Sequence, residues 1–546
     1  MVAFTLEGKV LVHGTGDSDA SSPGDLLYSS VALSFWGGVD PETAVVLDHT
    51  HPLHRKSVAG SLLAIPSGRG SCTGSQVLLE LILNGCAPKA IFTRDVDPIL
   101  CVGAIIADEV FGEEMVAKGL FVPPVVCLGN DGFDRLAGQN HALIALQPLK
   151  DGAMQIVVGT DSEECISLAV DINDDIETSS PRDSLGSFSR HDLLRTLELT
   201  EEERRILDGQ AGTDADRVAL RTICRVATVT ESPRLIPVTQ AHIDGCTYIG
   251  PGGLLFVEKL VELGGRVKVP TTLNSVSADR RRWRSLGVDE KLATPANKVG
   301  DAYLRLGCTG TFTCAPYLLP SKPGLGENIC WGESNAVVYS NSILGARTDK
   351  YADYMDICAA LVGRVPEYGV HLTENRMPEI VIDVNDFTDQ FILPMIDVYD
   401  GNLHRSHLDA FFPVLGHVCG SLSDGMIPII VGMEKLSGFI TKDDLKAFSA
   451  AFGTTGSVPL FHIMAITPEA SDSATAGAMV EICKKNVSVT HEMIMESVRL
   501  LDSGASDDKD EDGSIDLIAL GNPVSPSNFR ILTLVPVFKS VRRTWH

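Results

Sequence analysis

The sequence lacks the features that define several protein classes. It has no apolar run as long as the roughly 18 residues that a membrane helix needs, so no span is predicted. Its 45 basic residues are outnumbered by 71 acidic ones, and this net charge of −26 argues against a nucleic-acid-binding surface. The 13 cysteines are an odd number without a CxxC pair, which excludes a disulfide-dense secreted domain and a zinc ribbon. Residues 1–7 are neither basic nor continuously apolar, so no signal peptide is predicted.

What remains is a long, acidic chain with ample apolar content. Its 546 residues are 44% hydrophobic, with a mean hydropathy of +0.13. That length allows about three or four domains with real cores, and the apolar content excludes disorder as the main state. We expect reduced thiols, a cytoplasmic location and a monomer.

Short strand-like runs dominate the first part of the chain, and helical runs alternate with strands in the second. The runs bounded by Gly, Pro and Asp are 9–13, 44–47, 61–65, 124–127, 143–146 and 155–158, with an apolar helical stripe over 75–84. The acidic, Ser-rich segment 171–189 has linker composition. Beyond it we expect a capping box at Thr200 and Glu203, a helix over 254–263, strands at 266–269, 426–431 and 460–466, and an exposed acidic loop at 503–513. This alternation predicts an α/β fold with a mostly parallel sheet.

The clearest candidate site in the first part is IPSGRGSCTGS (65–75), which places a Gly-rich turn between a strand and a helix N-terminus. Such a turn collects free backbone N–H groups and favours an anion. Arg69 adds a guanidinium group that can bind a carboxylate or phosphate through two N–H donors. The positive potential of the turn also makes the Ser71 hydroxyl a candidate base. The alternative is an ordinary capped turn.

Other motifs leave two interpretations open. DHTHPLH (48–54) is either a metal site or a set of hydrogen-bonded histidines, and LSFWGGVD (33–40) is typical of core plus turn. Four polar loops at 240–247, 269–274, 310–317 and 331–336 form either a site for a small polar substrate or a series of turns. Cys314 is either a metal ligand, with Cys308 as a conceivable partner, or a lone buried thiol.

Several unbroken motifs resemble the aconitase X family. Its small swivelling domain is similar to LSFWGGVDP (33–41), HPL (51–53), PSGRGSCTGS (66–75) and APKAI (87–91). Its large catalytic domain is similar to AHIDG (241–245), VPTTLN (269–274), GTFTCAPY (310–317), ESNAVVYSNSILGART (333–348) and TPEA (467–470). The resemblance implies a β-rich α/β swivel domain over 1–165, a polar linker over 166–198 and an aconitase-like large part over 199–546, atypical after about residue 520.

The resemblance also implies a hydro-lyase with a small hydroxy acid as substrate. Fused members dehydrate cis-3-hydroxy-L-proline to Δ1-pyrroline-2-carboxylate; the alternatives are mevalonate 5-phosphate, another hydroxy acid, or ligand binding without turnover. By motif, Ser71 is the base, Cys314 is the first ligand of an iron–sulfur cluster, and the cluster iron is the Lewis acid. Substrate contacts are implied at Arg69, Gly70, Gly245, Cys246, Thr247, Asn274, Ser275, Glu333 and Ser334.

The end of the sequence departs from the family pattern. Where members carry a Gly-Cys-Pro-His motif with the second cluster ligand, this chain reads Gly521-Asn-Pro-Val-Ser525, and the family's third cysteine lies in a C-terminal segment that has no counterpart here. We therefore expect weak or incomplete iron binding unless Cys246, Cys308 or Cys330 substitutes.

Overall fold

The computed structural model describes residues 4–15, 24–139, 143–148, 153–159, 197–394, 405–455 and 458–503. The chain forms two compact units, Met1–Thr311 with Tyr351–Tyr368, and Phe312–Lys350 with Gly369–His546. In the part of the chain that the structure describes, no helix combines the length and apolar character needed to cross a membrane.

The first unit begins with a closed seven-stranded barrel. Its strands follow the order β1-β5-β4-β3-β2-β6-β7. The neighbours from β2 to β5 run parallel and the remaining pairs are antiparallel. Apolar side chains such as Leu26, Phe92, Val126 and Ile156 fill the interior. The strands are β1 (Phe4–Val12), β2 (Gly24–Tyr28), β3 (Leu62–Ile65), β4 (Ala90–Thr93), β5 (Val125–Cys127), β6 (Leu143–Pro148) and β7 (Ala153–Gly159).

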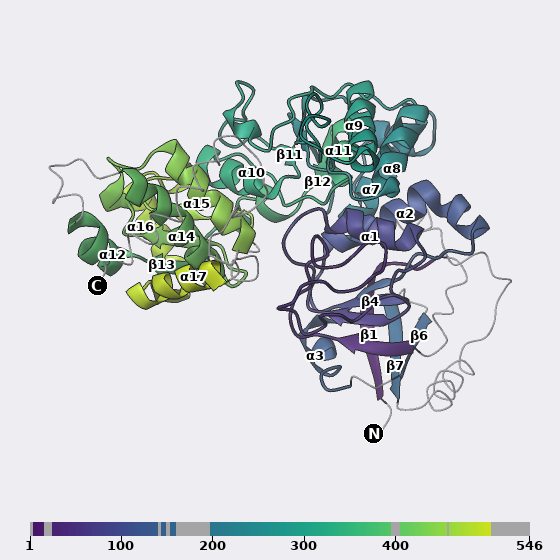
Figure 1. Cartoon of the computed structure of the whole chain (residues 1–546), viewed down its shortest axis with the longest axis horizontal. Coiled ribbons are helices and arrows are strands. Elements are labelled where there is room, and N and C mark those ends of the chain that lie inside the picture. Colours follow the sequence, from purple (N-terminus) through teal and green to yellow (C-terminus); the bar gives the residue numbers. More distant parts are fainter. Residues whose placement is uncertain are drawn as a thin grey trace. The chain divides into compact units, whose positions relative to one another are not determined.

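The helices of this barrel domain are α1 (Gly74–Leu83), α2 (Pro98–Ala117) and α3 (Gly129–Asp134). Figure 1 shows α1 and α2 side by side next to the barrel strands, and the two helices pack against each other. The predicted helix over 75–84 is confirmed. The strand predicted at 44–47 is wrong: Val45 and Val46 make only isolated bridges, because their backbone bonds hold a loop, as from Val46 N to Lys56 O at 2.8 Å.

The rest of the first unit is a set of helices around two small pairs of strands. β9 and β10 pair in parallel, and β8 and β12 pair antiparallel. The predicted capping box of Thr200 and Glu203 is confirmed. The predicted strand at 266–269 is wrong, because Val267 and Lys268 donate to Leu306 and Ala360 in loops and helix ends, and the strand starts only after Pro270. The elements are α6 (Glu201–Leu207), α7 (Asp214–Val229), β8 (Leu235–Pro237), β9 (Ala241–Ile243), α8 (Pro251–Glu262), β10 (Thr271–Leu273), α9 (Glu290–Arg305), α11 (Met355–Val362) and β12 (Arg364–Pro366).

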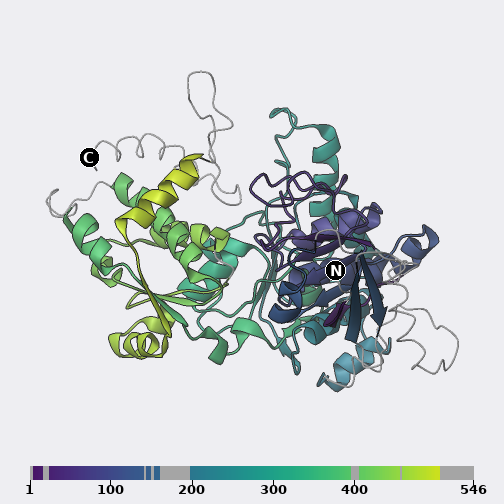
Figure 2. The ribbon, with the colours of Figure 1, turned by 90° about the horizontal axis from the view of Figure 1, so that it is seen from below.

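The second unit contains a four-stranded parallel sheet in the order β15-β14-β13-β16. Helices lie on both of its faces (Figure 2). Alternate strand residues serve each face: Ile382 and Ile430 pack with Phe412 and Phe448 of α14 and α15, whereas Val381 packs with residues of α16. The predicted α/β class and mostly parallel sheet are confirmed, although the run 460–466 supplies only a two-residue strand.

The second unit is built from short strands, α-helices and single turns. Its strands are β11 (Cys330–Trp331), β13 (Ile380–Asp383), β14 (Pro428–Val431), β15 (His462–Ile463) and β16 (Lys485–Ser488). Its α-helices are α10 (Ser334–Tyr339), α12 (Asn385–Phe387), α14 (Arg405–Ser423), α15 (Lys442–Thr455), α16 (Ser473–Ile482) and α17 (His491–Ser503). Its short 3₁₀ or π turns are η1 (Pro316–Leu318), η2 (Ser340–Leu344), η3 (Gly369–His371), η4 (Glu374–Arg376), η5 (Thr388–Ile392), η6 (Glu434–Leu436) and η7 (Pro468–Ala470). The segments 171–189, 504–513 and 521–525 lie outside the described residues.

Candidate active site

The turn between β3 and α1 carries Ser71, and three features fix its shape. Arg69 N donates to Leu33 O at 3.1 Å, so the turn pairs with the segment 33–40. Gly68 N donates to Asp97 Oδ2 at 2.5 Å. Gly70 has φ +83, a left-handed conformation that a side chain would strain. Gly70 is therefore needed for the turn itself, whatever the turn binds.

The Ser71 hydroxyl is half-buried and takes part in a small local network. Its Oγ donates to Thr73 Oγ1 at 2.9 Å and accepts from Thr73 N at 3.2 Å. Thr73 occupies the N-cap position of α1, but its side chain makes no cap hydrogen bond. The Thr73 hydroxyl is consequently available to Ser71 rather than to the helix end.

Arg69 is already paired in this structure. Its guanidinium lies 2.6 Å from the Asp48 carboxylate, with about half of the side chain exposed. Burial alone would raise the pKa of Asp48, but hydrogen bonds from Thr50 and Arg69 outweigh it, and the pKa is lowered. An anionic substrate end bound by Arg69 would therefore share this cation with Asp48.

His51, the buried histidine of the 48–54 motif, has a structural role. His51 Nδ1 accepts from Leu53 N at 3.2 Å, so Nε2 carries the proton and donates to Val31 O at 3.0 Å.

In the neighbouring motif, Phe35 is in the core as expected, but Trp36 is not: it is 38% exposed, because it follows the bend that brings Leu33 to the Ser71 turn. The core assignment of Trp36 is therefore wrong.

Two of the predicted substrate loops meet in the first unit. Asn274 Nδ2 donates to Asp244 Oδ1, and Asn274 N donates to Ile243 O at 2.9 Å. The Asp244 N–H in turn donates to Asp356 Oδ2 at 2.7 Å. The structure thus brings the loops 240–247 and 269–274 together at Asp244 and Asn274.

The members of these loops differ in exposure. Gly245 O accepts from the Tyr303 hydroxyl at 3.2 Å. Cys246 is fully buried and its Sγ points to Ile243 O at 3.6 Å, while Thr247 and Ser275 are half-buried. A direct substrate contact by the Cys246 side chain would need this thiol to become accessible. The substrate-binding role of this set stays a prediction.

Residues that the sequence did not single out connect α1 to the loop before α11. Gln76 Nε2 donates to Asp353 Oδ2 at 2.6 Å, Ser75 Oγ donates to Asp353 O at 3.2 Å, and Asp353 N donates to Cys72 O at 3.3 Å. Asp353 is fully buried. Burial, followed by the carboxyls of Asp244 and Asp356, raises its pKa well above the usual range.

A second buried carboxyl anchors α1 to the start of α8. Glu80 accepts from Gly252 N at 2.6 Å and from Gly253 N at 3.3 Å. Burial raises the pKa of Glu80 to about 7, although the two glycine N–H groups lower it. A side chain at Gly252 would meet Glu80 Oε1 at 2.7 Å, so this approach requires glycine. Gln76 and Glu80 are four residues apart in an otherwise apolar helix, and that spacing was the available signal for a buried polar contact.

The second unit holds the other predicted site residues. Cys314 is buried, and Phe312 before it has φ +43, a strained conformation of the kind that clusters at functional sites. Glu333 is fully buried and serves as the N-cap of α10, accepting from Ala336 N at 2.6 Å, while Ser334 is half-buried. The substrate contacts implied for these two residues stay predictions.

The described residues do not form a cluster-binding site. Among residues 4–503, where described, no group of three His, Cys, Asp or Glu side chains is arranged to hold a metal ion. Burial raises the pKa of Cys246 well above its usual range and that of Cys308 to about 12, so without a metal both are neutral thiols. Cys330 is likewise buried. The implied donor set is thus represented here by Cys314 alone.

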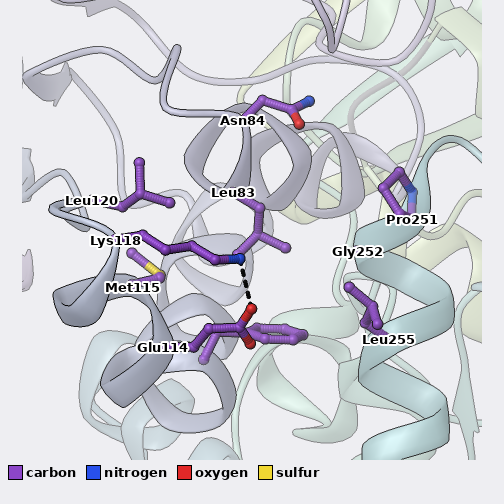
Figure 3. Close-up of a pocket in the computed structure, with 10 residues that line it drawn as sticks. Leu83, Asn84, Glu114, Met115, Lys118, Leu120, Pro251, Gly252 and Leu255 are labelled. Atoms are coloured by element: carbon purple, nitrogen blue, oxygen red, sulfur yellow. Dashed lines mark hydrogen bonds and ion pairs between the residues drawn. The ribbon is translucent and has the colours of Figure 1, made fainter.

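A surface pocket lies at the far end of α1 from Ser71 (Figure 3). Leu83, Leu120 and Leu255 line it, and the Lys118–Glu114 ion pair spans it at 2.6 Å. At 1.5 Å per residue, the length of α1 places Leu83 roughly 15 Å from the start of the helix. This pocket is therefore separate from the Ser71 turn.

Comparison with known proteins identifies the family. The aconitase X swivel domain matches residues 6–148, the first domain 196–374 and the second domain 378–499. The chain is 44% identical over 508 residues to cis-3-hydroxy-L-proline dehydratase of Pseudomonas aeruginosa, covering 92% of this chain and 76% of that protein. It is 39% identical over 520 residues to the Hypocrea jecorina protein of the same name, covering 95% and 77%.

More distant relatives match part of the chain. The phosphomevalonate dehydratase large subunit of Methanothermobacter thermautotrophicus is 32% identical over 51% of this chain and 67% of its own length. The holo-form structure of Thermococcus kodakaraensis aconitase X is 28% identical over 57% of this chain and 70% of its own, with a TM-score of 0.46. The three domain matches and the two near full-length relatives establish that the chain belongs to the aconitase X family of hydro-lyases.

Proposed function

We propose that this chain dehydrates cis-3-hydroxy-L-proline to Δ1-pyrroline-2-carboxylate. The observation that carries the proposal is the 44% identity to the Pseudomonas aeruginosa dehydratase of that substrate, over 92% of the chain. Loss of the C2 proton and the C3 hydroxyl gives an enamine that tautomerises to the imine product. The reaction needs a base positioned at C2 and a group that accepts the leaving hydroxyl.

We assign the base to Ser71. Its hydroxyl is half-buried at the N-terminal end of α1, at a turn shaped by Gly70 and by the Gly68–Asp97 contact. Backbone N–H groups at such a position stabilise negative charge on the oxygen and on a substrate carboxylate. Arg69 adds a cation that Asp48 holds in place.

The leaving hydroxyl is not assigned to a residue. An iron–sulfur cluster would supply a Lewis acid if it were bound. Because the described residues offer only Cys314 of the expected thiolates, they do not fit such a cluster, and no step is derived through it.

A phosphorylated hydroxy acid is the second candidate substrate, favoured by the match to phosphomevalonate dehydratase large subunits. These matches cover 51% and 60% of the chain at 31–32% identity. A phosphate would require cationic groups, and Arg69 of the Ser71 turn is already paired with Asp48. We therefore place this candidate second.

The test compares both substrates with one matched pair of variants. Iron-reconstituted protein is incubated with cis-3-hydroxy-L-proline or mevalonate 5-phosphate; the pyrroline product of the first is measured by its colour reaction, and loss of water from the second by mass spectrometry. Ser71→Ala should lower kcat by about 10² to 10⁴ while substrate still binds in calorimetry, because the turn survives. Ser61→Ala, which removes a hydroxyl bonded only to Val58 O, is the control and should keep kcat. Absence of both pyrroline formation and calorimetric binding of cis-3-hydroxy-L-proline with wild-type protein would overturn the substrate, and an active Ser71→Ala variant would overturn the base.

A further inference from the structure

We infer that Gln76 is a positioning residue that holds the Ser71 turn against the loop 244–247 and so sets where the base meets the substrate. This inference rests on the proposed function and deepens it, because no motif of the sequence gives Gln76 a role. It starts from a requirement of the reaction: the proposed base and the proposed substrate loop belong to separate segments of the chain. A displacement of about 1 Å between such groups can cost about 100-fold in rate.

Gln76 is buried in the first turn of α1, where it is 2% exposed. Its Nε2 donates to Asp353 Oδ2 at 2.6 Å, and this bond fixes the direction of the amide. A carboxyl oxygen accepts from an N–H group when the carboxyl is ionised, and the carbonyl oxygen of a neutral carboxyl does so too. The contact between Gln76 and Asp353 therefore does not depend on the charge of Asp353.

The segment that Gln76 holds also contacts the Ser71 turn. Asp353 N donates to Cys72 O at 3.3 Å, directly after Ser71 in the chain. Ser75 Oγ donates to the same Cys72 oxygen at 3.0 Å and to Asp353 O at 3.2 Å. Together with the Gln76 amide, these bonds tie residues 72–76 to the segment before α11. A displacement of Asp353 would therefore displace the backbone that carries Ser71.

The same amide lies against the loop 244–247. A Cβ at Gly245 would lie 3.6 Å from Gln76 Nε2 and 3.1 Å from the Tyr303 hydroxyl, so the loop backbone packs directly on both side chains. The Tyr303 hydroxyl donates to Gly245 O at 3.2 Å, and Asp356 Oδ2 accepts from Asp244 N at 2.7 Å. The loop is thus held by α9 and α11, and Gln76 is its contact with α1.

The other end of the amide faces the start of α8. A Cβ at Gly253 would lie 3.3 Å from Gln76 Oε1 and 3.2 Å from the Tyr354 hydroxyl. Backbone therefore encloses the Gln76 amide on two sides, and the carboxyl of Asp353 occupies its donor. Because closely packed interiors transmit displacements rather than absorb them, a change at Gln76 should reach both the Ser71 turn and the loop 244–247.

Glutamine supplies a neutral donor at a position surrounded by acids. The ionisable groups around Gln76 and Asp353 are Asp244, Asp356, Tyr303, Tyr354 and, one turn along α1, Glu80. A carboxyl in place of the amide would be bonded to Asp353 only while the two acids share a proton. Gln76→Glu therefore makes the contact dependent on pH, whereas in the wild-type protein the amide donates at every pH.

Steady-state kinetics provide the first arm of the test. With cis-3-hydroxy-L-proline, Gln76→Met, which keeps the length of the side chain but loses the donor, should lower kcat about 10- to 100-fold with KM within about threefold. Gln76→Glu should approach the wild-type kcat at about pH 5.5 and fall to that of Gln76→Met at about pH 8.5. Thr222→Val, which removes a buried hydrogen bond to Val218 O in α7, is the control and keeps kcat.

Three kinetic results would overturn the inference. They are a wild-type kcat in Gln76→Met, a change in KM alone, and a Gln76→Glu variant whose kcat relative to wild type is the same at every pH. The last result is the one expected of a residue that only stabilises the fold.

The second arm needs no turnover, so it decides the inference even where the proposed substrate fails. Hydrogen–deuterium exchange is followed by mass spectrometry in the peptides containing residues 71–76 and 244–250, each as a ratio to wild type at the same pH. Gln76→Met should speed exchange several-fold in both peptides and leave the β13 peptide of the second unit unchanged. Gln76→Glu should do so at about pH 8.5 but not at about pH 5.5. Wild-type exchange in the 244–250 peptide, or an equal increase throughout the first unit, would overturn the inference. If Gln76→Met does not fold, Gln76→Glu decides it in both arms.

Discussion

The pH dependence of stability should report on Glu80, which joins α1 to the first turn of α8. Replacing this residue by glutamine keeps an oxygen that accepts from Gly252 N but removes the ionisable proton. We expect Glu80→Gln to be more stable than the wild-type protein, and the difference to grow as the pH rises. The reason is that the buried site favours a neutral carboxyl.

The magnitude follows from the shift itself. The pKa of Glu80 is raised from 4.5 to about 7, so between these values the folded chain binds more protons than the unfolded chain. The free energy of unfolding of the wild-type protein therefore falls through this window, and ionisation of Glu80 costs the folded state about 3 kcal/mol above pH 7. The cost is about 1 kcal/mol at about pH 5, so the advantage of the variant should grow by about 2 kcal/mol between about pH 5 and about pH 8. Asp353 and Asp356, whose pKa values are also raised, are present in both proteins and cancel in the difference.

Urea unfolding followed by circular dichroism measures this difference at each pH. The control is Glu262→Gln at the other end of α8, where the carboxylate is 70% exposed and lies 3.7 Å from Lys259. That variant should differ little from wild type at any pH, because exposed pairs contribute little. A stability difference for Glu80→Gln that stays constant across this range, or that shrinks as the pH rises, would refute the reasoning.

Two further predictions concern other parts of the chain. Arg225 is 4% exposed and contacts both Asp108 at 2.5 Å and Glu109 at 2.9 Å, so Arg225→Ala should lower the free energy of unfolding by about 3–5 kcal/mol in urea denaturation; a loss below about 1 kcal/mol would contradict this. Anaerobic reconstitution followed by iron and sulfide quantification should give well under one cluster per chain, because Cys314 is the one thiol that the described residues offer with a predicted ligand role. Stable, near-stoichiometric cluster would show that other cysteines serve as ligands.

Local patterns predicted several of the barrel's strands and the Ser71 turn, because each is encoded in a short stretch, but they did not predict that the strands close into a barrel. Punctuated β-branched runs became β3, β5, β6 and β7, and the apolar stripe before Asn84 became α1. The same composition failed at 44–47 and 266–269, where the backbone bonds to loops and helix ends instead of a neighbouring strand. Strand-like composition alone does not supply a partner.

The contacts that complete the candidate site could not be predicted in this way. Gln76 and Asp353 are 277 residues apart in sequence, and Glu80 and Gly252 are 172 apart. No periodicity within one segment identifies such pairs. What the sequence does contain is a helix whose residues are almost all buried, with Gln76 and Glu80 on one face. Polar groups in such a helix require hydrogen-bond partners. The sequence therefore indicates that Gln76 and Glu80 have partners, but it does not indicate which residues these are.

These contacts make α1 the element that links the Ser71 turn to the rest of the first unit. Ser71 lies three residues before α1, Gln76 holds Asp353 one turn into the helix, and Glu80 holds α8 one turn further on. The contacts of Gln76 and Glu80 differ in the parts of the chain that they connect. Asp353 is held by Ser75 and Gln76, close in sequence to Ser71, whereas Glu80 accepts from backbone N–H groups at the start of α8. Loss of the Asp353 contact should therefore disturb the Ser71 turn and lower kcat, and loss of the Glu80 charge should change stability, although Gln76 and Glu80 belong to one buried face of α1.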